Sequence, residues 1–170
     1  MEEKAIVTTE RLLIRLWNKN DIDDFYKIMS DPMVTRFTRK GPWTYENTKA
    51  MVIGNINHTN IKTGIYNLPL VRRSDKKILG RVGLNRYLVA ENIPEIQWTL
   101  GREYWNSGYA TEIGKAMIEY GFNVTGFNEI VGFTDPDNIG SKKVMEKIGM
   151  TFVEEKEHLG YIYVFYSIRK

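Results

Sequence analysis

A glycine-containing loop that opens a helix has the residue types and spacing needed to bind an anion. Residues 95–112 read EIQWTLGREYWNSGYATE, in which a strand-like run leads into small residues and a helical period begins at Gly108. The first amides of a helix have no carbonyl partner, and the helix dipole adds about half a positive charge there. Because Gly108 has no Cβ, a bulky anion can approach the backbone closely. The pattern predicts a phosphate or diphosphate site at 106–111.

Two better-known phosphate motifs are absent from the sequence, and a plain structural reading of Gly108 stays open. There is no G-x-G-x-x-G, and the run Gly108…Gly114-Lys115-Ala116 misses the P-loop spacing by one residue and lacks its Ser or Thr. The sequence therefore does not predict a nucleoside triphosphatase. Taken alone, a glycine at the start of a helix more often only forms a tight turn.

The composition fits one globular domain without disulfides. The 170 residues are 42% hydrophobic and 26% charged, and no Pro- or Ser-rich linker, low-complexity tract or repeat divides them, so we expect a single domain over 1–170. With no Cys, the chain has no thiolate zinc site and no cysteine nucleophile. The two histidines, His58 and His158, lack the usual ligand pairings, so we expect no metal.

The charge pattern and the N-terminus suggest an ordinary soluble protein. The net charge of +3 is scattered over the chain, whereas nucleic-acid binding needs a denser basic stripe, so we expect no nucleic-acid partner. We find no secretory signal and no 18-residue apolar run, and we expect a cytoplasmic protein without a membrane partner. A C-terminal hairpin with an exposed edge leaves both a monomer and a homodimer open.

Hydrophobic periodicity predicts an α+β, or mixed α/β, arrangement around one sheet. The expected strands are 10–16, 66–73, 78–88, 95–100, 128–134, 152–158 and 161–169. The expected helices run from a cap at Asn20 or Asp21 to about Asp31, from Thr44 to before Gly64, from Gly108 to Val124, and from after Asn138 to a cap at Gly149.

Three segments together resemble one known family. Residues 104–112, YWNSGYATE, are similar to the acetyl-CoA loop of GCN5-related N-acetyltransferases (GNAT), especially the RimJ/RimL-like branch that acetylates ribosomal-protein N-termini and usually has WGKGYATEA. Residues 138–150, NIGSKKVMEKIGM, are similar to the family's N-x-x-S-x-x-V-x-x-K-x-G-F. Residues 9–15, TERLLIR, look like the branch's first strand. The three lie in the family's order and spacing over nearly the whole chain.

The resemblance implies the GNAT fold and acetyl-CoA as co-substrate. The fold would have one mostly antiparallel sheet of about six to seven strands, about four helices, and a splayed pair of strands that binds acetyl-CoA. The pantetheine arm would pair with the backbone of Trp98, Thr99 and Leu100 like an added strand, and Asn138 would bind it from the other side. The diphosphate would bind the amides of Asn106, Ser107, Gly108, Tyr109, Ala110 and Thr111.

The loop departs from the family pattern at a few positions. Asn106 and Ser107 replace the usual Gly and Lys, and Ile113 replaces Ala. Because the loop is expected to bind phosphate through backbone N–H groups, these changes should alter affinity more than function.

The resemblance also implies roles in direct transfer of the acetyl group to an amine. The N–H of Thr99 would polarise the thioester carbonyl. Glu95 matches the position of a general base that acts through a water, although a solvated glutamate at the end of a strand is an equally good reading. Met145 stands where many relatives have a Tyr, so Ser141 is left to donate to the leaving thiolate, unless it is only a small packing residue.

The sequence favours an α-amino acceptor without identifying it. A lysine-like amine, of pKa about 10.4, is far more protonated near neutral pH than an α-amino group of about 7.7–8.0. We therefore expect a protein N-terminus, with a ribosomal protein as the family's suggestion. A polyamine or aminoglycoside acceptor, or a non-catalytic CoA-binding sensor, stays open. Arg36, Phe37, Trp43 and Tyr45 could line the acceptor site, but the loops 31–45 and 88–94 carry no readable code.

Overall fold

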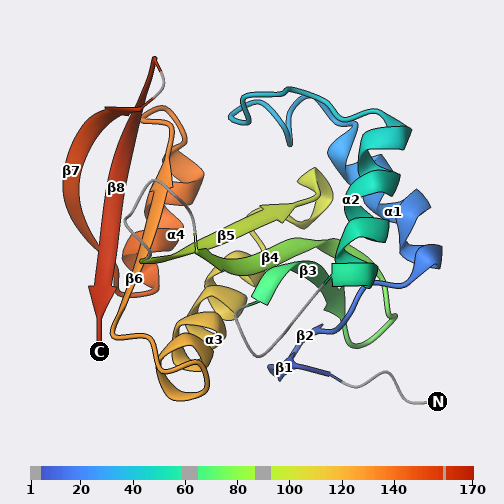
Figure 1. Cartoon of the computed structure of the whole chain (residues 1–170), viewed down its shortest axis with the longest axis horizontal. Helices are drawn as coiled ribbons and strands as arrows, with labels where there is room; N and C mark the ends of the chain where they lie inside the picture. The colour runs from blue at the N-terminus through green and yellow to red at the C-terminus, as the bar shows by residue number, and fades with distance from the viewer. Residues whose placement is uncertain (1–4, 59–64, 87–92, 159) are drawn as a thin grey trace.

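The strands of the chain form one eight-stranded sheet that divides into two halves. The computed structural model describes residues 5–58, 65–86, 93–158 and 160–170 (Figure 1). The strand order is β1-β2-β3-β4-β5-β6-β8-β7, and β5 and β6 are its parallel pair, all other neighbours being antiparallel. The strands are β1 (Val7–Thr8), β2 (Leu12–Ile14), β3 (Ile65–Arg72), β4 (Ile78–Arg86), β5 (Pro94–Leu100), β6 (Glu129–Thr134), β7 (Thr151–His158) and β8 (Tyr161–Arg169).

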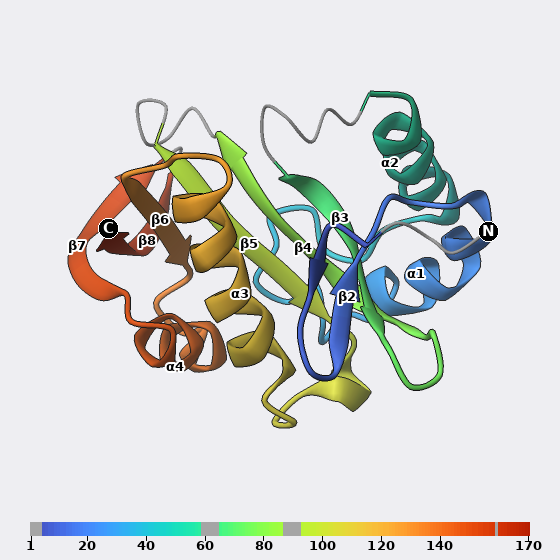
Figure 2. The same cartoon turned by 90° about the horizontal axis from the view of Figure 1, so that it is seen from below.

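Helices cover both faces of the sheet. They are α1 (Ile22–Met29), α2 (Tyr45–His58), α3 (Tyr109–Asn123) and α4 (Ile139–Lys147), with 3-10 turns η1 (Lys19–Asp21) and η3 (Arg102–Tyr104). The first two helices pack together against β3 and β4, whereas α3 and α4 lie side by side on the other face (Figure 2). Two small residues allow close packing there: a Cβ on Gly121 of α3 would come within 2.6 Å of Ile130, and one on Gly132 of β6 within 2.9 Å of Met145.

The two halves of the sheet are joined at one end and separate at the other. The parallel register of β5 and β6 is Glu95 opposite Val131. Beyond this point β5 stays paired with β4 as far as Leu100, and β6 stays paired with β8 as far as Thr134. The strands therefore diverge after Glu95, as Figure 1 shows. The splayed pair that the sequence predicts is present.

The predicted elements are confirmed within a few residues, with one strand added. β1 was not predicted because two residues carry no readable alternation. It pairs with β2 and makes the eighth strand, one or two more than expected. The predicted continuation of α2 to 64 and most of the predicted loop 88–94 lie outside the described residues. The predicted C-cap is confirmed, since Gly149 has a φ of 94°.

The predicted cap of α1 is wrong because Asp21 is used in a buried ion pair. Asp21 occupies the N-cap position but makes no capping hydrogen bond. Its carboxylate binds both terminal nitrogens of Arg15 at 2.7 and 2.8 Å and accepts from the Asn18 N–H at 2.8 Å. Asn18 supplies the cap instead, one turn earlier, by accepting from the N–H of Asn20. The side chains of Arg15 and Asp21 are only 7% and 8% exposed, so each charge is stabilised by the other in a buried ion pair.

We expect Asp21→Asn to lower the free energy of unfolding by about 3 kcal/mol, because it removes the carboxylate charge that both terminal nitrogens of the buried Arg15 guanidinium contact. The measurement is urea denaturation at neutral pH. The matched control is Asp24→Asn, which removes an ion pair to Lys27 whose partners are both more than half exposed, so its effect should stay below about 1 kcal/mol. Equal small losses from the two variants would contradict a structural role of the buried pair.

Candidate active site

Two residues with positive φ shape the loop that precedes α3. Gly108 is the N-cap residue with φ 79°, and Asn106 has φ 57°, a conformation that Gly and Asn adopt more readily than other residues. Glu112 is the first residue whose N–H reaches a helical carbonyl, that of Gly108 at 3.0 Å. Within the described residues, the amides of 108–111 have no protein acceptor. The loop therefore has the form that an anion site at 106–111 requires, and binding there stays a prediction.

The backbone of β5 presents alternate residues to the opening between β5 and β6. The Gly101 N–H donates to the Leu79 carbonyl at 2.9 Å, and a Cβ on Gly80 would come within 1.8 Å of the Thr99 carbonyl oxygen. Thr99 is paired with Arg81 of β4, so its N–H and C=O both point toward β4. The predicted use of the Thr99 N–H on the thioester carbonyl is therefore not supported by this geometry.

Trp98 and Leu100 are the predicted β5 residues whose backbone faces the opening. They alternate with Thr99 along the strand, so their N–H and C=O groups point away from β4. The Leu100 carbonyl already accepts from the indole N–H of Trp105 at 2.9 Å. The N–H groups of Trp98 and Leu100 and the carbonyl of Trp98 are therefore available to hydrogen-bond an added strand.

Glu95 lies buried at the point where β5 and β6 separate. It pairs with Asn85 of β4 and Val131 of β6 and is only 3% exposed, so the reading as a solvated strand-end residue is wrong. Desolvation by burial raises the pKa of Glu95 to about 8, against the opposing effect of a hydrogen bond with Gln97. Its Oε2 has no hydrogen-bond partner among the described residues. A buried carboxyl with a free oxygen and a pKa near neutrality is suited to accept a proton.

Asn138 joins the end of β6 to the start of α4. Its Oδ1 accepts from the Ser141 N–H at 3.2 Å and its Nδ2 donates to Thr134 Oγ1 at 3.0 Å. One hydrogen of the Asn138 Nδ2 group is donated to Thr134, so the predicted binding of the pantetheine arm by Asn138 would use the other hydrogen. Ser141 is half-buried, and within the described residues its hydroxyl makes no hydrogen bond. Met145 is in the core and only 1% exposed.

The loop 31–43 crosses the sheet on the face that carries the Glu95 side chain. At one end Trp43 lies under the guanidinium of Arg81, 5.1 Å from ring centre to Cζ, and Arg81 approaches Thr99 Oγ1 at 3.4 Å. At the other, Arg39 donates to the Tyr163 hydroxyl of β8 at 2.5 Å. Since β5 and β6 lie between β4 and β8, the loop passes over their separation (Figure 1).

Of the other residues predicted for the acceptor site, Tyr45 points elsewhere. Its hydroxyl donates to Asp23 of α1 at 2.9 Å, and its ring packs against Tyr26. The cation of Arg36 lies 5.2 Å from the ring centre of Phe37, its neighbour in the loop.

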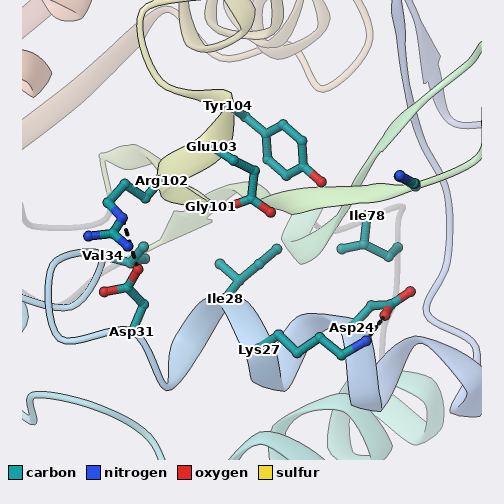
Figure 3. Close-up of a pocket in the computed structure, with 11 residues that line it drawn as sticks. Asp24, Lys27, Ile28, Asp31, Val34, Ile78, Gly101, Arg102, Glu103 and Tyr104 are labelled. Carbon is teal, nitrogen blue, oxygen red and sulfur yellow. Dashed lines mark hydrogen bonds and ion pairs between the residues drawn. The ribbon is translucent and has the colours of Figure 1, made fainter.

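The surface has two hollows near these loops, one beside loop 31–43 and one beside the start of α3, and Glu95 lines neither of them. The first, of about 270 Å³, lies between α1 and η3 and is drawn in Figure 3, where Lys27 points to Asp24 and Arg102 to Asp31. These pairs are 2.8 and 3.4 Å apart, so their charges are already compensated. The second, of about 430 Å³, is lined by four basic residues, Arg11, Arg72, Arg73 and Lys76, together with Glu10, Ser74 and Tyr109.

Three residues that join the N-terminal hairpin to the start of α3 were missed: Thr9 and Arg11 of the hairpin and Glu112 of α3. Thr9 and Arg11 bind Glu112 in the first turn of α3, and Arg11 also binds the Ser107 carbonyl. The sequence contained a signal for this contact, because the family-like segment 9–15 carries the positive charge of Arg11 and the family-like segment 104–112 carries the negative charge of Glu112. The sequence alone does not show that Arg11 and Glu112, which are 101 positions apart, are in contact.

The sheet is open at one end, a loop before α3 leaves backbone amides free, and a buried carboxyl lies where the two halves of the sheet join. Comparisons with known proteins place this arrangement in a class of acyl-transferring enzymes. The acetyltransferase (GNAT) domain model matches residues 11–151, and the chain belongs to this family of N-acetyltransferases, which use acetyl-CoA.

Relatives and solved structures agree with this assignment. The chain is 35% identical over 144 residues to the uncharacterized N-acetyltransferase YnaD of Bacillus subtilis, covering 85% of this chain and 81% of YnaD. A GNAT-family acetyltransferase of Bacillus anthracis superposes with a TM-score of 0.84 at 28% identity, covering 96% and 97% of the two chains. A candidate ribosomal-protein-serine acetyltransferase of Vibrio cholerae shares the fold, with a TM-score of 0.77 at 16% identity and 96% and 97% coverage.

The residues present fit acetyl-CoA better than they fit a metal. The opening offers the free N–H groups of β5 to an amide-containing arm, and the amides of 108–111 face no acceptor. In the described parts of the chain no three His, Cys, Asp or Glu side chains gather as metal ligands. Nor does any helix there have the length and apolarity to cross a membrane.

Glu95→Gln should stabilise the fold increasingly as the pH rises. Because the folded-state pKa of about 8 lies above the ordinary 4.5, the wild-type carboxyl contributes its full share of stability below pH 4.5 and loses it progressively up to pH 8. The variant has no such loss, so its advantage in unfolding free energy should grow between pH 5 and 8.5, by at most about 5 kcal/mol. Urea denaturation at both pH values measures it. The exposed control Glu119→Gln should show no trend, and a constant offset for Glu95→Gln would contradict the raised pKa.

Proposed function

We propose that the chain transfers the acetyl group of acetyl-CoA directly to a primary amine, and that the amine is the α-amino group of a protein N-terminus. The observation that carries the proposal is the buried Glu95 carboxyl, with one oxygen free and a pKa of about 8, where the two halves of the sheet separate. Acetyl-CoA supplies the thioester, so that a C–N bond forms as the C–S bond breaks. The residues of the chain then have to bind the donor and remove a proton.

Two segments with free backbone N–H groups, β5 and the loop before α3, supply most of the residues proposed to bind acetyl-CoA. The Trp98 and Leu100 N–H groups would bind the pantetheine amides as an added strand does, and the nearer of them would polarise the thioester carbonyl in place of Thr99. The amides of Asn106, Ser107, Gly108, Tyr109, Ala110 and Thr111 would hold the diphosphate. Asn138 would contact the arm from β6, and the free Ser141 hydroxyl would donate to the departing thiolate.

The pKa of Glu95 matches an α-amino acceptor. Proton transfer is most effective when donor and acceptor have similar pKa values near the working pH. An α-ammonium of pKa about 7.7–8.0 loses its proton to Glu95 at almost no cost, whereas a lysine-like ammonium of about 10.4 must lose it uphill by more than two units. Glu95 is therefore suited to an N-terminus more than to a lysine or a polyamine.

The charges on the acceptor face support the same choice. Loop 31–43 exposes Arg36, Arg39 and Lys40, and Arg81 lies beneath it near Thr99. The one acidic residue of the loop, Asp31, is paired with Arg102. A polyamine or an aminoglycoside carries several positive charges that would be repelled here, while a peptide with neutral or acidic residues after its first position would not.

Replacing the proposed base, Glu95, distinguishes an acetyltransferase from a non-catalytic CoA-binding sensor. Glu95→Gln should lower kcat/KM for an N-terminal peptide by about 100-fold or more while leaving CoA affinity unchanged. In the wild type, kcat/KM should rise with pH and level off above about 8, because Glu95 must first lose its proton. The measurement is thiol release at pH 6 to 9.5, with Glu119→Gln as the control. Wild-type protein that binds CoA but releases no thiol with any amine would favour the sensor instead.

Acceptor choice should follow charge. At low salt we expect N-terminal peptides with neutral or acidic second and third residues to be acetylated at least about tenfold faster than spermidine or an aminoglycoside, and the gap should narrow in 0.5 M salt as screening weakens the repulsion. Mass spectrometry identifies the acetylated nitrogen. Peptides with an N-terminal block and a free lysine are the matched control, and they should react slowly. Preference for the polycations would refute the N-terminal acceptor while leaving acetyl transfer intact.

A further inference from the structure

The N-terminal hairpin is fastened to the loop before α3 through one arginine. We propose that Arg11 is a positioning residue for the diphosphate-binding amides: by holding the Ser107 carbonyl it turns the Gly108 N–H toward the diphosphate of acetyl-CoA, while Glu112 and Thr9 hold Arg11 in place. The inference rests on the proposed function, because it requires the diphosphate to bind at 106–111.

Arg11 contacts the loop at three places. Its Nη1 donates to the Ser107 carbonyl at 3.0 Å, and its guanidinium lies over the Tyr109 ring, 4.5 Å from the ring centre. Its Nη2 would be 3.4 Å from a Cβ on Gly108, so the arginine sits directly against the residue that begins the helix. The side chain of Arg11 thus backs the loop from the β1–β2 side.

The carbonyl contact fixes the direction of an amide. The Ser107–Gly108 peptide bond is trans and planar, so the Gly108 N–H points opposite to the Ser107 carbonyl. With the carbonyl turned to Arg11, the N–H is turned away from the hairpin. Figure 2 shows the hairpin and α4 on opposite sides of the start of α3. The residues on either side, Asn106 and Gly108, are both in the left-handed region, where other peptide orientations are accessible without such a tie.

A carboxylate and a hydroxyl hold Arg11 in turn. Glu112 Oε2 accepts from Arg11 Nε at 2.6 Å, and Glu112 Oε1 accepts from the Arg11 N–H at 3.0 Å and the Thr9 hydroxyl at 2.6 Å. Burial opposes the charge of Glu112, yet the hydrogen bonds from Thr9 and Arg11 outweigh it and lower its pKa. The arginine therefore reaches the loop as part of a neutral pair, which favours a geometric role over simple charge attraction.

Two variants separate geometry from charge, and a third serves as the control. Arg11→Met removes the tie. Glu112→Gln keeps one of the two oxygen acceptors and removes a negative charge beside the loop, so charge attraction alone predicts tighter CoA binding, whereas loss of positioning predicts weaker binding. Arg73→Met is the matched control, because Arg73 fastens the same hairpin through the Thr9 and Glu10 carbonyls and its contacts in the structure do not include the loop.

Calorimetry with CoA, kinetics with acetyl-CoA and S-acetylpantetheine, and thermal unfolding of each variant form the experiment. Arg11→Met should weaken CoA binding and raise the KM for acetyl-CoA by about 10- to 50-fold, the effect of losing a hydrogen bond to a charged group. Its kcat should stay within about twofold, and so should its KM for S-acetylpantetheine, which lacks the diphosphate. Glu112→Gln should weaken CoA binding by about threefold to tenfold, and Arg11→Lys should recover part of the loss, since lysine keeps one donor.

Any of four results would overturn the inference alone, and three of them concern CoA binding: wild-type CoA affinity in Arg11→Met, equal weakening in Arg11→Met and Arg73→Met, or tighter binding in Glu112→Gln. Equal loss toward both donors would also overturn it, since a merely loosened fold would act on both. A wild-type chain that binds no CoA would instead overturn the proposed function together with this inference, so the two failures are distinguishable.

Discussion

The parallel pairing of β5 and β6 at one end only is the constraint on which the rest of the site depends. Had the two strands stayed paired over their length, the Trp98 and Leu100 amides would be used inside the sheet, and no edge would be free for a ligand. Because β4 and β8 each hold their own neighbour to the far end, the separation costs no hydrogen bonds on the outer sides. The same junction buries Glu95 where the strands begin to part. One topological feature thus supplies both a binding edge and a perturbed carboxyl.

The loop proposed to bind the diphosphate depends on a second, weaker constraint that comes from the N-terminal end of the chain. A loop with two positive-φ residues has little intrinsic preference for one peptide orientation. The β1–β2 hairpin, itself only two and three residues long in its strands, is held against α3 by Glu112. The N-terminal segment is therefore placed at the site although it carries no reacting group. This gives a physical reason why the segment 9–15 and the loop 104–112 both resemble the same family.

Local chemistry could be predicted from the sequence, whereas properties set by pairing could not. Gly108, the period of α3 and the cap at Gly149 follow from local residue preferences, and the structure has all three. The direction of the Thr99 amide depends on which β5 residues pair with β4, and a shift of one residue reverses it. The burial of Glu95 depends on flanking strands 10 and 36 positions away, and the use of Asp21 depends on Arg15 rather than on the helix that follows. Contacts made outside the residue's own strand or helix decided each of these properties.

Glu95 combines two demands that oppose each other, and this makes a purely structural role difficult to sustain. At a position flanked on both sides by strands, an apolar β-branched residue would pack without desolvating a charge. The carboxyl instead raises its own pKa toward 8 and leaves one oxygen unsatisfied. Among described residues its neighbour Gln97 offsets only part of this cost. A fold retains such a group at a loss of stability above neutral pH when the protonation change itself is used. The raised pKa and the unpartnered oxygen of Glu95 therefore support the proposed proton transfer at the junction of the sheet.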